Sequence, residues 1–290
     1  MTRVGGIGCA LIGLGPSTML FFLTVVISPL KLIVVTGSGF VWILSLLLTS
    51  LVWIVLNLLT SHIASSLVVA VLSQELMRFV FYKLIIMADN GLQVVAASLQ
   101  ACSTRPVSHL TSSNGEEPVT DARPTISGVT CESSVSFRPK KERADNLLNH
   151  GGVAYVAGLG FGLMGCIFEL LPNVTLAFGP GVGFETWKSK TFFVVAAFEV
   201  MCLSLLQIFW SIILFEAYKR KSYGHIIVVI STHILLSCLS LLNQFNYPWP
   251  EVVCTVYLLS LFAAAVYTYA SLGDRHCNTC QPAAHTSDVT

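Results

Sequence analysis

The chain has 290 residues, of which 54% are hydrophobic and only 11% charged, and its formal net charge is +1. Soluble globular domains carry about 25% charged residues, so this composition excludes an ordinary soluble protein. The near-neutral charge also gives no sign of the basic patch that nucleic-acid binding requires. We therefore expect an integral membrane protein.

Seven apolar stretches are long enough to cross a bilayer as helices, which takes about 20 residues. They lie at residues 4–27, 32–56, 63–87, 151–171, 192–215, 223–242 and 252–272. The first stretch is too long for the apolar part of a signal peptide, and its basic flank is Arg3 alone, so we expect a retained helix. The sequence predicts an all-α polytopic membrane protein with seven transmembrane helices.

The lysines and arginines predict how these helices are oriented. If the N-terminus is luminal or extracellular and the C-terminus cytoplasmic, all but three of the 16 lie on the cytoplasmic side, the exceptions being Arg3, Lys188 and Lys190. Membrane proteins concentrate positive charge on that side. The same topology places the sequon Asn173-Val-Thr175 in the lumen close to the membrane, which makes Asn173 a candidate glycosylation site.

The chain is expected to divide into four segments. Residues 1–87 hold three helices and residues 151–272 hold four, while residues 88–150 form a cytoplasmic loop and residues 273–290 a cytoplasmic tail. The loop is rich in Ser, Thr, Pro and Glu, which predicts a disordered, solvated linker rather than a specific binding motif. In the tail, Cys277 and Cys280 form an isolated C-x-x-C that is weak evidence for zinc or redox chemistry.

Three small residues recur every fourth position in the fourth predicted helix: Gly158, Gly162 and Cys166. This spacing stacks them on one helix face. Small side chains there leave a groove in which the backbone of another helix can come close. The pattern predicts a surface for helix packing and assembly.

Polar residues inside membrane spans are costly and indicate functional or assembly sites. Glu75 and Arg78 are three residues apart, so they share one helix face and can neutralise each other. A structural pair facing the bundle interior is favoured over a catalytic acid.

His233 could hydrogen-bond across helices, move a proton or bind a metal. Interhelical hydrogen bonding is favoured because no second intramembrane histidine is evident, and Gln207 could make a similar contact. Glu199 is also expected to face the interior.

Nothing in the spans indicates an enzyme. The aspartates all lie outside them, so the chain alone cannot provide a membrane-embedded aspartate pair; they are Asp89, Asp121, Asp145, Asp274 and Asp288. The sequence lacks H-E-x-x-H, and Thr36-Gly-Ser-Gly39 matches a serine nucleophile turn only in part. We expect no catalytic residue, cofactor or metal site.

Several residue clusters occur in order along the predicted helices. They are Gly15-Pro16, residues 41–48, Gln74-Glu75 with Arg78-Phe79, Tyr155-Val156 with Gly158 and Gly162, residues 178–182, Phe209-Trp210, His233 and residues 241–243. Together they resemble the anterior-pharynx-defective family, the seven-span scaffold subunit of γ-secretase.

The resemblance implies a non-catalytic scaffold that assembles and stabilises an intramembrane aspartyl protease acting on type I membrane proteins such as Notch and amyloid precursor protein. The implied partners are presenilin, nicastrin and presenilin enhancer, in membranes from the endoplasmic reticulum and Golgi to the plasma membrane and endosomes. Two residues depart from the family pattern. Cys166 stands where the family has a third glycine, and Gln207 stands where it usually has one of two intramembrane histidines.

The sequence leaves one main alternative open, a seven-helix receptor or transporter that acts alone. Seven spans with an outside N-terminus fit a receptor superficially. However, the longest cytoplasmic loop follows the third span, and no receptor activation motif is visible.

Overall fold

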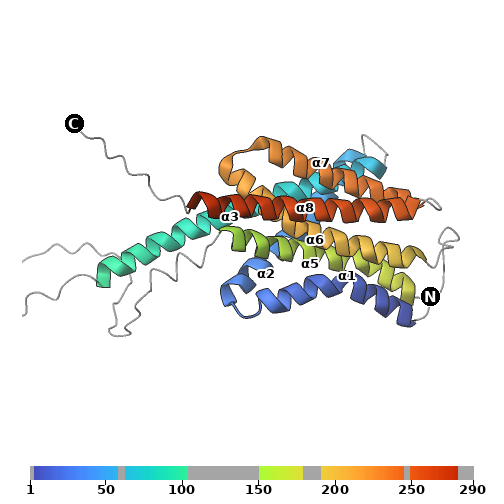
Figure 1. Cartoon of the computed structure of the whole chain (residues 1–290), viewed down its shortest axis with the longest axis horizontal. Coiled ribbons are helices and arrows are strands. Elements are labelled where there is room, and N and C mark those ends of the chain that lie inside the picture. The colour runs from blue at the N-terminus through green and yellow to red at the C-terminus, as the bar shows by residue number, and fades with distance from the viewer. Residues whose placement is uncertain (1–2, 58–62, 104–149, 179–190, 245–248, 280–290) are drawn as a thin grey trace, which may run out of the picture. The chain divides into compact units, whose positions relative to one another are not determined.

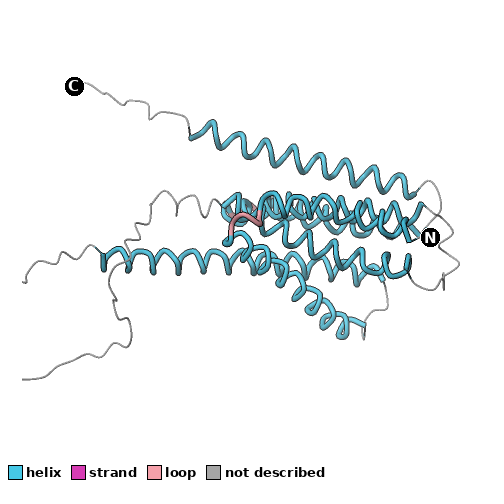
Figure 2. Tube along the Cα trace, turned by 90° about the horizontal axis from the view of Figure 1, so that it is seen from below, coloured by secondary structure: helices cyan, strands magenta, loops and turns pink. Residues whose placement is uncertain are grey.

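The computed structural model describes residues 3–57, 63–103, 150–178, 191–244 and 249–279, and nearly all of them are helical (Figures 1 and 2). The helices are α1 (Arg3–Thr24), α2 (Pro29–Asn57), α3 (Ile63–Ser103), α5 (His150–Phe178), α6 (Thr191–Arg220), α7 (Tyr223–Leu239), the short 3-10 helix η1 (Ser240–Gln244) and α8 (Trp249–Thr279). The chain forms two compact units, one of residues 1–84 with 149–290 and one of residues 85–148.

Six of the described helices are long and apolar enough to cross a membrane. The spanning stretches are Gly5–Thr24, Pro29–Val55, Gly151–Pro172, Phe193–Arg220, Tyr223–Leu242 and Trp249–Ser271. The chain is therefore an all-helical, multi-pass integral membrane protein. The predicted span at residues 63–87 lies in α3, which is not among these six, so the seventh crossing stays a prediction.

The cytoplasmic loop is predicted to begin at residue 88, but the structure has a helix in the first part of that segment. Helix α3 continues to Ser103, beyond the predicted end of its span. Within this continuation, Gln93 Nε2 donates a hydrogen bond to Asp89 Oδ2 at 3.2 Å, one helical turn away. The rest of the predicted loop, residues 104–149, lies outside the described residues, as do residues 280–290 of the tail, including Cys280.

Helices α5 and α6 form the core of the first unit. Helix α5 packs against α1, α2 and α6, while α6 also contacts α1, α7 and α8 (Figure 1). In their most apolar windows, 67% of α5 and 56% of α6 is buried, compared with 17–33% for the other four spanning helices. Those outer helices expose apolar side chains such as Leu11 and Phe262, as expected of surfaces that face lipid or other membrane proteins.

A tight turn joins α6 to α7. Ser222 N–H donates to Ala217 O at 3.0 Å and Lys221 N–H to Tyr218 O at 3.4 Å, which is the Schellman pattern of a helix C-terminus. Lys221 has a φ of 55°, in the left-handed region that favours glycine.

We predict that Lys221→Gly raises the free energy of unfolding by about 1 kcal/mol, because it removes the strain of a side chain in this conformation. Thermal unfolding of the detergent-solubilised chain measures the effect. Lys219→Gly is the matched control: it places glycine inside the helix and should lower stability by a similar amount. A loss of stability in both variants would contradict the prediction.

Candidate functional site: a buried polar cluster

Four polar side chains from three helices meet inside the first unit: Glu75 and Arg78 of α3, Gln207 of α6 and His233 of α7. All four are buried, with at most 7% of their surface exposed. We call them the polar cluster. The sequence predicted each residue as an intramembrane contact, and the structure brings all four together.

The ion pair of Glu75 and Arg78 forms the centre of the cluster. Arg78 Nη1 lies 2.9 Å from Glu75 Oε1 and 3.0 Å from Oε2, so one nitrogen reaches both carboxylate oxygens. The residues are one helical turn apart on α3, which brings their side chains to the same face. Each charge thus has an opposite charge beside it, as burial requires.

Gln207 and His233 connect this pair to two other helices. Arg78 Nη2 donates to Gln207 Oε1, and His233 Nδ1 lies 2.7 Å from Glu75 Oε1. A carboxylate can only accept, so the imidazole donates its Nδ1 proton in this contact. Gln207 and His233 therefore contact opposite members of the ion pair, and hydrogen bonds tie α3 to both α6 and α7.

Two aromatic rings line the cluster, and the sequence did not reveal their roles. The guanidinium carbon of Arg78 lies 5.0 Å from the centre of the Phe161 ring, within the range of a cation–π contact. Trp210 and His233 have ring centroids 4.5 Å apart. Their spacing offered one signal: Phe161 follows Gly158 by three residues and Trp210 follows Gln207 by three, so each shares a helix face with a predicted contact residue.

The glycine face of α5 packs against α6 of the same chain. A Cβ atom added at Gly158 would lie 2.7 Å from Ile208 Cα and 2.9 Å from Gln207 O, closer than atoms can pack. One added at Gly162 would collide with Ser204 O. The close helix approach that the spacing predicts is thus made within the chain, and it places α6 so that Gln207 enters the polar cluster.

Cys166, the third residue of the predicted face, contacts a different helix. Its side chain is buried, and its thiol donates to Gly13 O of α1 at 3.2 Å. The three small residues therefore hold α5 against two neighbours, α6 and α1, rather than against one.

The other predicted residues lie apart from the polar cluster. Asn173 belongs to the last part of α5, and its side chain lies outside the described residues, so its glycosylation stays a prediction. Glu199 of α6 is buried, as expected. Ser38, from the partial nucleophile motif, donates to Val35 O of its own helix at 2.9 Å. Among the described residues, no group of three or more metal-binding side chains occurs.

The fold and the buried cluster define an integral, multi-pass helical membrane protein whose polar interior joins helices to one another. The chain belongs to the Aph-1 family: the family model described as "Aph-1 protein" matches residues 4–275, nearly the whole chain. The family is non-catalytic, so the chain itself is not an enzyme.

Curated relatives from distant organisms agree with this assignment. Gamma-secretase subunit Aph-1 of Drosophila melanogaster is 30% identical over 266 residues, which cover 92% of each chain. Gamma-secretase subunit APH-1B of Homo sapiens is 27% identical over 84% of this chain and 81% of its own length. Gamma-secretase subunit APH1-like of Arabidopsis thaliana is 26% identical over 84% of this chain and 83% of its own length.

Proposed function

We propose that the chain is the scaffold subunit of a γ-secretase complex, where it stabilises the intramembrane aspartyl protease without taking part in catalysis. The observation that carries this proposal is the family match over residues 4–275. The structure offers a physical reason. The four side chains of the polar cluster pair with one another, leaving Arg78 Nε as a buried group without a hydrogen-bond partner among the described residues. The outer helices, by contrast, present apolar side chains that neighbouring helices can cover.

The partners we propose are presenilin, nicastrin and presenilin enhancer, and the substrates of the assembled protease are type I membrane proteins such as Notch and amyloid precursor protein. Presenilin supplies the catalytic aspartates, which fits the position of all aspartates of this chain outside the predicted spans. The complex acts in membranes from the endoplasmic reticulum and Golgi to the plasma membrane and endosomes.

Affinity purification in a mild detergent tests the proposal. A tagged full-length chain should bring down presenilin-like and nicastrin-like subunits, identified by mass spectrometry. A ligand-dependent or transport activity of the purified chain alone, with no presenilin relative bound, would favour the alternative of a receptor or transporter.

We further propose seven spans, with the N-terminus luminal and the C-terminus cytoplasmic. The first part of α3 is the additional span, because pairing of Glu75 with Arg78 lowers the cost of charges within the membrane. An epitope tag at the C-terminus should bind antibody only after the plasma membrane is permeabilised, while one at the N-terminus should bind on intact cells. The reverse pattern would contradict the topology.

We infer that a hydrogen bond at residue 207, rather than a titrating group, is what the cluster needs. Gln207→His should then preserve complex yield, since an imidazole can also accept from Arg78. Gln207→Leu should lower the stability of the chain by about 1–3 kcal/mol, because it leaves a buried guanidinium N–H without its partner. Equal complex yields from the histidine and leucine variants would show that the contact is dispensable.

A further inference from the structure

A cavity of about 600 Å³ lies between α6, α7 and α8, next to the polar cluster, because Trp210, which packs against His233, is also one of its lining residues. Its walls are mostly apolar, with Ile213 from α6, Val228 and Val229 from α7, and Ala263 and Ala264 from α8. The volume is within the range of sites that hold small ligands.

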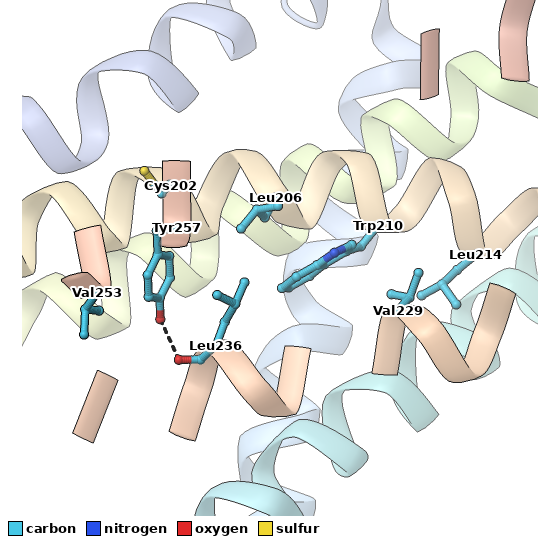
Figure 3. Close-up of a cluster of buried hydrophobic side chains, with 8 residues drawn as sticks. All are labelled: Cys202, Leu206, Trp210, Leu214, Val229, Leu236, Val253 and Tyr257. Carbon is cyan, nitrogen blue, oxygen red and sulfur yellow. Dashed lines mark hydrogen bonds between the residues drawn. The ribbon is translucent and has the colours of Figure 1, made fainter. Parts of the chain in front are cut away.

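Helices α7 and α8 contact each other toward one end, whereas toward the other end the side chains between them are too small to fill the space. Toward the end of α7, Tyr257 Oη donates to Leu236 O at 2.9 Å, in a buried cluster that includes Val253 (Figure 3). Farther along α8, the lining residues Ser260, Ala263, Ala264 and Tyr267 follow helical spacing. Three of these four side chains are small, so the space between the helices stays open.

One end of the cavity lies beside a cluster of positive charge. Ser222, Gly224 and His225 line it, and they follow directly after Lys219 and Arg220 in the last turn of α6 and Lys221 in the connection to α7. Arg220 Nε pairs with Glu216 at 2.6 Å. The two lysines are exposed, and neither forms an ion pair with any residue that the structure describes.

The length of the cavity corresponds to one leaflet of a bilayer. Along α7 its lining runs from Gly224 to Thr232, a rise of about 12 Å at 1.5 Å per residue. This rise is similar to half the thickness of the hydrocarbon core of a bilayer, which is about 30 Å in all. With the α6–α7 turn at the membrane surface, where the predicted topology places it, a cavity of this length would extend to about the middle of the bilayer.

We propose that this cavity holds one acyl chain of an anionic phospholipid, with the lipid phosphate between Lys219 and Lys221. An extended peptide is a poorer occupant, because the apolar walls would leave its backbone N–H and C=O groups without partners. An acyl chain has no such groups. Lysines at a membrane surface attract the anionic lipids of the cytoplasmic leaflet, which is where the predicted topology places this turn.

Photo-crosslinking tests the site. The full-length chain, in its assembled complex, is reconstituted in nanodiscs of phosphatidylcholine with a minor fraction of phosphatidylserine that carries a diazirine in one acyl chain. We expect saturable crosslinks to peptides that contain residues 224–232 and 260–267. A phosphatidylcholine probe with the same diazirine should label these peptides less.

Two pairs of variants separate the acyl and headgroup contacts. Ala263→Trp should fill the cavity and abolish the crosslinks, whereas Phe262→Trp, at an exposed neighbouring position that does not line it, should leave them unchanged. The double variant Lys219→Gln/Lys221→Gln should weaken phosphatidylserine labelling by about tenfold. Lys31→Gln removes a positive charge at the start of α2, between other helices, and should have little effect.

Three results would overturn the proposal. They are equal labelling of the two tryptophan variants, equal labelling by phosphatidylserine and phosphatidylcholine, and crosslinks from a photoreactive residue at position 263 to a protein segment instead of lipid.

Discussion

Arg78→Leu is expected to destabilise the chain by about 3–5 kcal/mol, because it leaves the Glu75 carboxylate buried without its counter-charge. It also removes the donor to Gln207 and the contact with Phe161. A loss of this size approaches the whole stability of many domains, so the yield of folded protein should collapse. Thermal unfolding and the monodisperse fraction in detergent measure it.

A second Glu–Arg pair of the chain serves as the control. Glu216 and Arg220 also face each other on one helix, but their side chains are 21% and 62% exposed. Arg220→Gln should therefore cost less than about 1 kcal/mol. The double variant Glu75→Gln/Arg78→Met should recover part of the loss, because neither charge then remains buried alone. Similar small effects of Arg78→Leu and Arg220→Gln would refute a structural role for the polar cluster.

Gly158→Leu is expected to cost about 3 kcal/mol and to reduce complex formation strongly. Even a Cβ at this position would lie 2.7 Å from Ile208 Cα, which is backbone and cannot swing aside. A leucine must therefore push α5 and α6 apart, and this movement withdraws Gln207 from Arg78. Unfolding of the purified chain and co-purification of the partner subunits provide the two measurements.

Gly152→Leu is the matched control, since it makes the same change on the same helix. Nothing lies within 4 Å of a Cβ added there, so the variant should fold and assemble normally. If Gly158→Leu also assembled normally, the close packing of α5 on α6 would not be needed for the complex.

The helices could be predicted from sequence because apolar composition and length are local properties. The structure confirms the helical, multi-pass class, and most helix ends fall within a few residues of the predicted spans. Helix α3 is the main exception, since it continues through residues 88–103. That segment lacks the hydropathy of a span, and the composition of the loop beyond it suggested disorder.

The contacts of the site could be predicted only where they are local. Glu75 and Arg78 lie one turn apart, so their spacing alone brings them together. Their contacts to Gln207 and His233 join residues 129 and 158 positions apart, and no local pattern encodes such pairs. Likewise, the spacing of Gly158, Gly162 and Cys166 predicted how closely a helix could approach but not that α6 and α1 of the same chain would be the helices.

The most direct test of the central claim is complementation in cells whose own Aph-1 genes have been deleted. Expression of this chain should restore mature presenilin fragments and cleavage of a Notch-based reporter, and the Arg78→Leu variant should restore neither. Two results would contradict a role as the non-catalytic scaffold of γ-secretase. One is cleavage of the reporter in cells whose only presenilin is a catalytically inactive form, and the other is no cleavage although the wild-type chain is well expressed.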